Sequence, residues 1–107
     1  MTDDSAQAFD KLASQLLEDP DDDVALTSRG LHVHGKLFAW LDDGDLVVDL
    51  PPDRAGDLVE RGVAAPAADP VVAPKGAWVR IGDPEDWPEL ASESHQFVGE
   101  PAVGKES

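Results

Sequence analysis

Hydrophobic positions near the amino end of the chain recur at helical spacing. Between residues 5 and 17 they fall on one stripe, which consists of Ala6, Phe9, Leu12, Ala13, Leu16 and Leu17. This spacing predicts an amphipathic helix that packs one face on a core. Asp4 or Ser5 can cap its start. The acidic run of residues 18–23 contains Pro20 and predicts a solvated loop after the helix.

The hydrophobic pattern then changes to short runs that predict strands at residues 24–27, 31–34 and 77–81, with a hairpin at residues 36–52. Asp43-Gly44 is a strong signal for a two-residue hairpin turn. In the register that this turn sets, the facing pairs are Leu41 with Leu46, Ala39 with Val48, and Leu37 with Leu50. Because side chains alternate between the faces of a strand, we expect these pairs to form the core face.

The same register gives the hairpin a second apolar face. It places Trp40 opposite Val47 and Phe38 opposite Asp49. Two large aromatic side chains on this face need a cover. Either a helix or the connection at residues 63–76 folds over them, or the face binds a partner or a second copy of the chain. Phe38, Trp40, Val47 and Asp49 are therefore a candidate interaction surface.

Two further helices complete the predicted elements. One begins at Pro51-Pro52-Asp53 and ends before Gly62, which suits a left-handed C-cap. The other has its main body from Pro88, while the Ala- and Pro-rich residues 63–72 predict an extended connection. The element order predicts an α+β fold, with a small antiparallel curled sheet and about three packed helices. We expect one domain over residues 1–99 and a polar tail over residues 100–107.

Charge narrows the range of partners. The chain has 23 acidic residues against 8 basic ones, and its formal net charge is -15. Such a field repels nucleic acids and anionic membranes, so we expect direct binding to neither. We favour a surface adapted to a high-salt cytoplasm over an acidic surface that binds a basic partner. Asp42 and Asp45 face each other in the hairpin, and this like-charge pair should destabilise the fold at low salt.

Other features of the composition exclude several classes of protein. The chain has no cysteine, which excludes disulfides, thiolate metal sites and cysteine nucleophiles. No apolar run approaches the roughly 20 residues that span a bilayer. The acidic amino terminus lacks the basic and apolar regions of a secretory signal. We therefore expect a soluble cytoplasmic protein.

His32 and His34 are the strongest candidates for a metal site. Two residues apart on a strand, they would share a face, and a site would need a further ligand such as Asp49. The alternative is a polar, solvent-facing pair on an edge strand. The run from Asp42 to Asp45 lacks the alternating ligands of a calcium loop. The prediction is that the chain holds neither a metal nor a cofactor.

Catalytic motifs are also weak in this sequence. Ser28, Ser92, Ser94 and His95 supply a nucleophile and a base in principle, but none lies in a recognisable motif. Ser94 and His95 are expected on the polar side of the last helix. No glycine-rich phosphate loop follows a strand. We expect a protein that is not an enzyme and has no catalytic residues.

The segments 35–41 (GKLFAWL) and 44–51 (GDLVVDLP) carry a family resemblance. The other matching positions are Arg54, Leu58, Val59, Gly62, Lys75, Trp78, Val79, Trp87, Leu90, Phe97 and Val98. Together they resemble the amino-terminal domain of TfoX/Sxy-type proteins, whose fold is related to that of MmcQ/YjbR proteins. The usual Met-Phe-Gly-like step is replaced by residues 26–30. The resemblance implies a small α+β domain with a regulatory role through protein partners, and it implies no catalytic residues.

These observations predict a non-enzymatic cytoplasmic domain that acts through protein contacts, as a monomer or a homodimer. The alternative is a small-molecule or metal-binding protein that uses the sheet face near His32, His34, Phe38 and Trp40.

Overall fold

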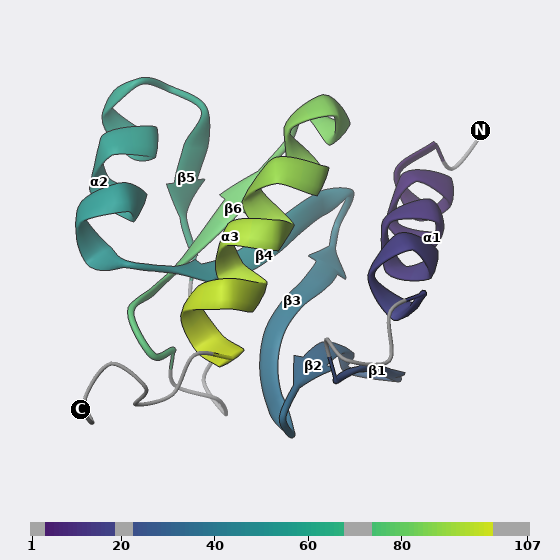
Figure 1. Cartoon of the computed structure of the whole chain (residues 1–107). Helices are drawn as coiled ribbons and strands as arrows, with labels where there is room; N and C mark the ends of the chain where they lie inside the picture. The colour runs from purple at the N-terminus through teal and green to yellow at the C-terminus, as the bar shows by residue number, and fades with distance from the viewer. Residues whose placement is uncertain (1–3, 19–22, 68–73, 100–107) are drawn as a thin grey trace, which may run out of the picture.

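The computed structural model describes residues 4–18, 23–67 and 74–99. In chain order the elements are α1 (Asp4–Leu17), β1 (Val24–Thr27), β2 (Gly30–Val33), β3 (Lys36–Asp42), β4 (Asp45–Leu50), α2 (Pro52–Glu60), β5 (Ala64–Pro66), β6 (Ala77–Ile81), the 3-10 turn η2 (Pro84–Asp86) and α3 (Trp87–Gly99). The predicted α+β fold is confirmed: three helices pack on a curled sheet (Figure 1).

The sheet has six strands in the order β1-β2-β3-β4-β6-β5, and every neighbouring pair is antiparallel. The predicted hairpin register is confirmed from Ala39 opposite Val48 to Asp42 opposite Asp45. Its turn residue Asp43 has φ 55°, a left-handed conformation that a two-residue hairpin turn requires. The connection at residues 63–72 contributes β5, a short edge strand that pairs with β6.

A β-bulge at Phe38 changes the faces of β3. Leu31 pairs with Ala39 but His32 pairs with Leu37, so Phe38 is an extra residue between two pairs. Phe38 and Ala39 consequently both join the cluster that the helices cover, while Leu37 joins Trp40 on the other face. The prediction that Phe38 shares a face with Trp40 was wrong. Placing Leu37 on the core face was wrong for the same reason.

All three helices contribute to one core on one face of the sheet (Figure 1). Its buried members are Leu12, Ala13, Leu31, Val33, Phe38, Ala39, Leu46, Val48, Leu50, Ala55, Leu58, Val79, Ile81, Trp87, Leu90, Ala91 and Val98. The indole of Trp87 is fully buried, and its Nε1 donates a hydrogen bond to the carbonyl of Ile81 (2.9 Å). This bond satisfies the polar atom of a large core side chain.

The opposite face carries a smaller cluster of Leu37, Val47 and Trp78, against which Trp40 and Ala67 pack. The rings of Trp40 and Trp78 meet edge to face, with centroids 4.6 Å apart and planes at 73°. Trp40 is half-buried. Of the alternatives for the cover, a helix is wrong for Trp40, because the helices pack on the first core. Ala67 belongs to the predicted covering connection, and residues 68–73 of that connection lie outside the described residues.

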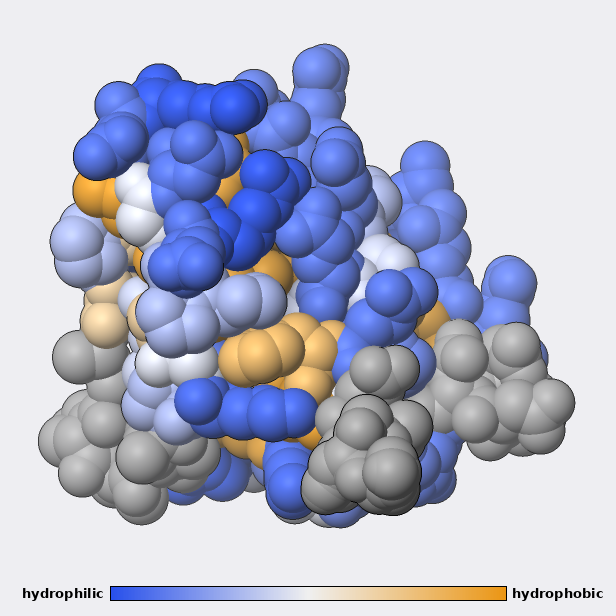
Figure 2. Space-filling view, turned by 60° about the vertical axis from the view of Figure 1, so that its left-hand side comes forward, coloured by the Kyte–Doolittle hydropathy of each residue, from blue (hydrophilic) through white to orange (hydrophobic). Residues whose placement is uncertain are grey.

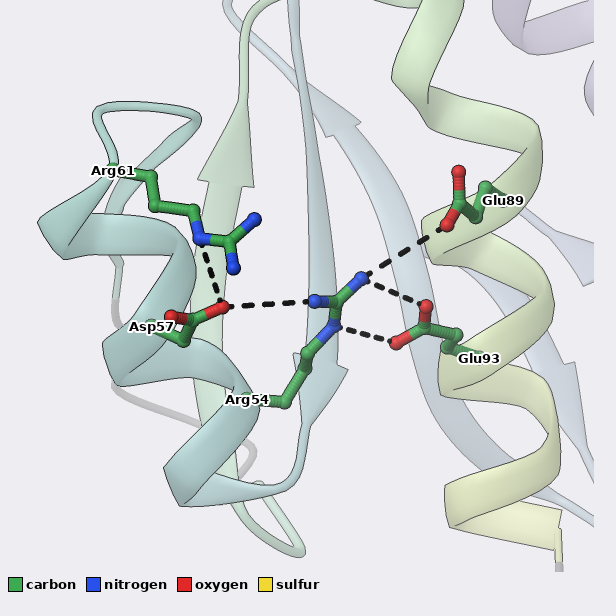
Figure 3. Close-up of polar contacts among 5 residues, drawn as sticks. All are labelled: Arg54, Asp57, Arg61, Glu89 and Glu93. Atoms are coloured by element: carbon green, nitrogen blue, oxygen red, sulfur yellow. Dashed lines mark hydrogen bonds and ion pairs between the residues drawn. The ribbon is translucent and has the colours of Figure 1, made fainter.

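Helices α2 and α3 are joined by a bidentate ion pair (Figure 3). Arg54 Nε lies 2.9 Å from Glu93 Oε1, and Arg54 Nη2 lies 3.0 Å from Glu93 Oε2. The guanidinium also lies 3.8 Å from Asp57 and 4.0 Å from Glu89. Arg54 thus holds together two acidic helix surfaces. Turned so that the α2 side comes forward, Figure 2 shows a mainly hydrophilic surface with a small hydrophobic patch near its centre.

Candidate functional site

The four residues of the predicted interaction surface do not form one surface. Phe38 lies in the helix-covered core and is fully buried. Trp40 and Val47 lie together in the smaller cluster on the opposite face. Asp49 is only 2% exposed and is held by backbone groups. The Phe38 bulge separates the two aromatic residues, so a partner surface made of all four is excluded.

Asp49 anchors the start of β6 to β4. Its Oδ2 accepts a hydrogen bond from the Lys75 amide (2.6 Å), and its Oδ1 accepts one from the Gly76 amide (2.9 Å). Burial raises the pKa of this carboxyl, and the pull of the two amides and of the Lys75 charge in the other direction offsets this only in part. Both carboxylate oxygens are therefore engaged by the protein's own backbone, which assigns Asp49 a structural role.

Ser94 fills the gap where β3 and β4 separate. Its hydroxyl donates to the carbonyl of Phe38 (3.0 Å) and accepts from the amide of Asp49 (3.2 Å). Ser94 is fully buried, so its predicted place on the polar side of α3 was wrong. His95 lies next to it in sequence, but its ring meets the Phe38 ring edge to face at 5.7 Å. The Ser94 hydroxyl is a backbone bridge, which leaves it unsuited to act as a nucleophile.

The two candidate metal ligands point to different partners. His34 has φ 54° and lies in the turn after β2, where its Nδ1 is 2.6 Å from Asp23 Oδ2. His32 lies on β2, with Nε2 2.9 Å from Thr27 Oγ1. Because His34 leaves the strand, the prediction that both histidines share a strand face was wrong. Within the described residues, no group of three metal-ligating side chains comes together.

A groove of about 520 Å³ opens where the ends of several elements meet. Its lining comes from both turns that flank β2, from β3, β4, the approach to β6 and the end of α3: Arg29, His32, Gly35, Lys36, Leu37, Asp49, Pro74, Lys75 and Val98. Three of the chain's eight Lys and Arg residues line this groove, although the protein is strongly acidic. Sequence reasoning missed this cluster, because its residues come from segments that only the sheet topology brings together.

A second exposed feature lies along β1, at the end of the sheet. Among the described residues, the exposed large hydrophobic ones are Leu17 at the end of α1 (41%) and Leu26 on β1 (47%). Helix α1 packs against β1, so both leucines belong to this end of the molecule. The His34 amide donates to the Asp23 carbonyl (3.3 Å), so the backbone groups of residue 23 point toward β2. Along β1, the backbone groups of successive residues then point alternately away from β2 and toward it. By that alternation, the backbone groups of Leu26 point away from β2.

Comparisons of the chain with family models, curated proteins and solved structures found no match. The resemblance to TfoX/Sxy-type domains therefore stays a prediction. Across the part of the chain that the structure describes, no helix has the length and apolar character needed to cross a membrane.

Proposed function

We propose that this chain is a non-catalytic cytoplasmic domain, of the kind that the TfoX/Sxy resemblance implies, which binds a partner protein along β1. The observation that carries the proposal is the combination of a sheet edge with exposed leucines. Leu26 lies on the end strand, and Leu17 lies on the helix that packs against it. Exposed apolar side chains beside an open strand edge are typical of a surface that accepts an added strand.

The two ends of the sheet differ in how well they suit a partner strand. At one end of the sheet, β5 has only three residues and ends in Pro66, which cannot donate a backbone hydrogen bond. Edge strands that avoid pairing commonly use such short lengths and prolines. At the other end of the sheet, β1 has four residues without proline, and the amide and carbonyl of Leu26 point away from β2. The β1 edge is therefore the proposed binding edge.

The acidic surface, interpreted above as an adaptation to high salt, still suits a basic partner segment better than a second copy of the chain. Each copy carries a formal net charge of -15, so two copies repel each other at any but high ionic strength. An extended segment with Lys or Arg beside its apolar residues is not repelled by the acidic surface at any salt concentration, and it is attracted during encounter where screening is weak. The proposed occupant is an extended, basic segment of another protein, which adds to the sheet antiparallel or parallel to β1.

Site-specific photo-crosslinking tests the proposal. A photoreactive amino acid at position 26 should give an adduct in an extract of the native host, whereas the same amino acid at Ala65 on β5 should not. Mass spectrometry should place the crosslink in an extended basic segment of the partner, and a synthetic peptide of that segment should compete. An adduct between two copies of the chain, or equal labelling from position 65, would show that the proposal is wrong.

A backbone variant separates strand addition from simple apolar contact. Leu26→Pro removes an outward amide without removing a bond to β2, and prolines are tolerated at such edge positions. We expect Leu26→Pro to keep its circular dichroism spectrum and to lose the partner peptide. Leu26→Ala keeps the amide and should retain part of the affinity. Equal affinities of the two variants would contradict backbone pairing.

A further inference from the structure

The groove beside β2 has the composition of a ligand site. Its volume of about 520 Å³ lies within the range of small-molecule pockets. Leu37, Pro74 and Val98 give it an apolar lining, while Arg29, Lys36 and Lys75 bring positive charge to it. Small-molecule sites commonly combine such an apolar wall with a few placed polar groups.

The placement of the cations indicates the shape of the ligand. Arg29 lies in the turn just before β2, and Lys36 pairs with Val33 at the other end of that strand. Three residue steps of a strand separate these two ends, which is about 10 Å. Leu37 lies on β3 beside His32, in the middle of this span. A ligand that satisfies both ends needs two acidic groups with an apolar part between them.

Among the described residues, one carboxylate, that of Asp49, lines the groove, and the Lys75 ammonium offsets its charge in part. Asp49 is buried, and its two oxygens accept hydrogen bonds from the Lys75 and Gly76 amides. The Lys75 ammonium donates to the Phe97 carbonyl (2.7 Å) and lies 4.8 Å from the centre of the Phe97 ring. This contact places a positive charge where the negative end of the α3 dipole would otherwise repel an anion. The groove therefore combines an apolar wall with a locally positive rim.

We propose that this groove binds an elongated organic dianion, with an acidic group at each end of an apolar chain. Arg29 and Lys36 hold the two acidic groups, and Leu37, Pro74 and Val98 contact the chain between them. The acidic groups are carboxylates or phosphates, since both are recognised by Arg and Lys. The site does not include Leu17 or Leu26, and its test uses other probes, so the two proposals are tested independently.

Ligand titration followed by NMR tests the proposal with probes that differ in one property at a time. Suberate carries two carboxylates on a six-methylene chain, and hexane-1,6-diyl bisphosphate carries two phosphates on a similar chain. We expect at least one of them to bind saturably and to shift the amide signals of Arg29, His32 and Leu37. Hexanoate has one acidic group and succinate has a shorter chain, and both should bind about tenfold more weakly. Absence of saturable binding by both long dianions overturns the proposal.

Matched charge variants show whether the binding depends on the groove. Arg29→Gln and Lys36→Gln should each weaken binding about fivefold. Lys11→Gln, on exposed α1, changes the net charge by the same amount and should leave binding within about twofold. An equal loss in all three variants would indicate general repulsion by the acidic protein and would overturn the site. The preferred probe distinguishes a carboxylate ligand from a phosphate ligand.

Discussion

The two faces of the sheet use aromatic residues in different ways. On the covered face, Phe38 is fully buried beneath the helices, and Trp87 at the start of α3 is buried in the same continuous core. On the other face, Trp40 is half-buried and meets Trp78 edge to face in a cluster with Leu37, Val47 and Ala67. The helices bury the Phe38 ring completely, whereas on the other face Trp78 is buried and Trp40 is covered only in part. The covered face should therefore hold most of the stability of this domain.

The two faces also differ in how their polar groups are satisfied. On the covered side, Ser94 bridges the backbone of Phe38 and Asp49, where the bulge has opened the ladder between β3 and β4. On the other side, Arg80 reaches the carboxylates of Asp42 and Asp45 at 2.8 and 3.1 Å. The first arrangement is buried and the second is exposed to solvent in part. Losing the first should cost more than losing the second.

The largest expected effect comes from truncating one aromatic residue on each face. Phe38→Ala should lower the free energy of unfolding by about 3 to 5 kcal/mol, because it leaves a cavity in the helix-covered core. Trp40→Ala should cost about 2 kcal/mol, since it loses partial burial and the edge contact with Trp78. Urea denaturation in molar potassium chloride measures both. Equal costs for the two variants would show that the second face is as firmly covered as the first.

A smaller effect is expected from the buried hydroxyl. Ser94→Ala leaves the Phe38 carbonyl and the Asp49 amide without their partner, and should cost about 1 to 3 kcal/mol. Ser92→Ala is the matched control on the exposed side of the same helix, and should change stability by less than about 0.5 kcal/mol. The Asp49 amide should also exchange its proton faster in Ser94→Ala. A neutral Ser94→Ala would mean that water or a local shift replaces the hydroxyl.

Local patterns in the sequence were sufficient for the turn end of the hairpin, because its register there depends on a turn between adjacent strands. Asp43-Gly44 fixed Leu41 opposite Leu46 and Trp40 opposite Val47, as the structure has them. The bulge at Phe38 depends on the pairing of β3 with β2, which the hairpin turn does not determine. Alternation counted along β3 therefore failed at the bulge and assigned Phe38 to the wrong face.

Gly30 makes another close contact that the local sequence pattern does not predict. The pair Arg29-Gly30 is typical of a turn, and the turn is there. The structure adds a second reason for the glycine: a Cβ at Gly30 would lie 2.5 Å from the Cβ of Trp40 and 2.4 Å from the carbonyl oxygen of Ala39. This close approach results from the pairing of β2 with β3 in the sheet. The groove was not predicted from the sequence for a similar reason, because the fold brings Lys75 from a distant segment to Arg29 and Lys36.

The smallest effect concerns the acidic end of the second face. The sequence predicts that Asp42 and Asp45 repel each other at low salt, but Arg80 on β6 lies against both carboxylates and also donates to the Asp42 carbonyl. The strand pair thus has its own counterion. Arg80→Gln should expose the repulsion and cost about 0.5 to 1 kcal/mol at low salt. Because screening weakens this repulsion, the cost should largely vanish in molar potassium chloride.

The comparison with Arg61→Gln makes the salt experiment specific. Arg61 is 65% exposed and follows the last residue of α2, where it pairs with Asp57 one turn earlier, so its loss should change stability little at either salt concentration. If Arg80→Gln costs the same at low and high salt, the guanidinium acts through packing of its stem on the second face and not through charge. If Arg80→Gln has no cost at low salt, the Asp42 and Asp45 carboxylates do not repel enough to matter. In that case, repulsion between Asp42 and Asp45 contributes nothing measurable to the free energy of unfolding. Any stabilisation of the whole domain by salt must then arise elsewhere on its acidic surface.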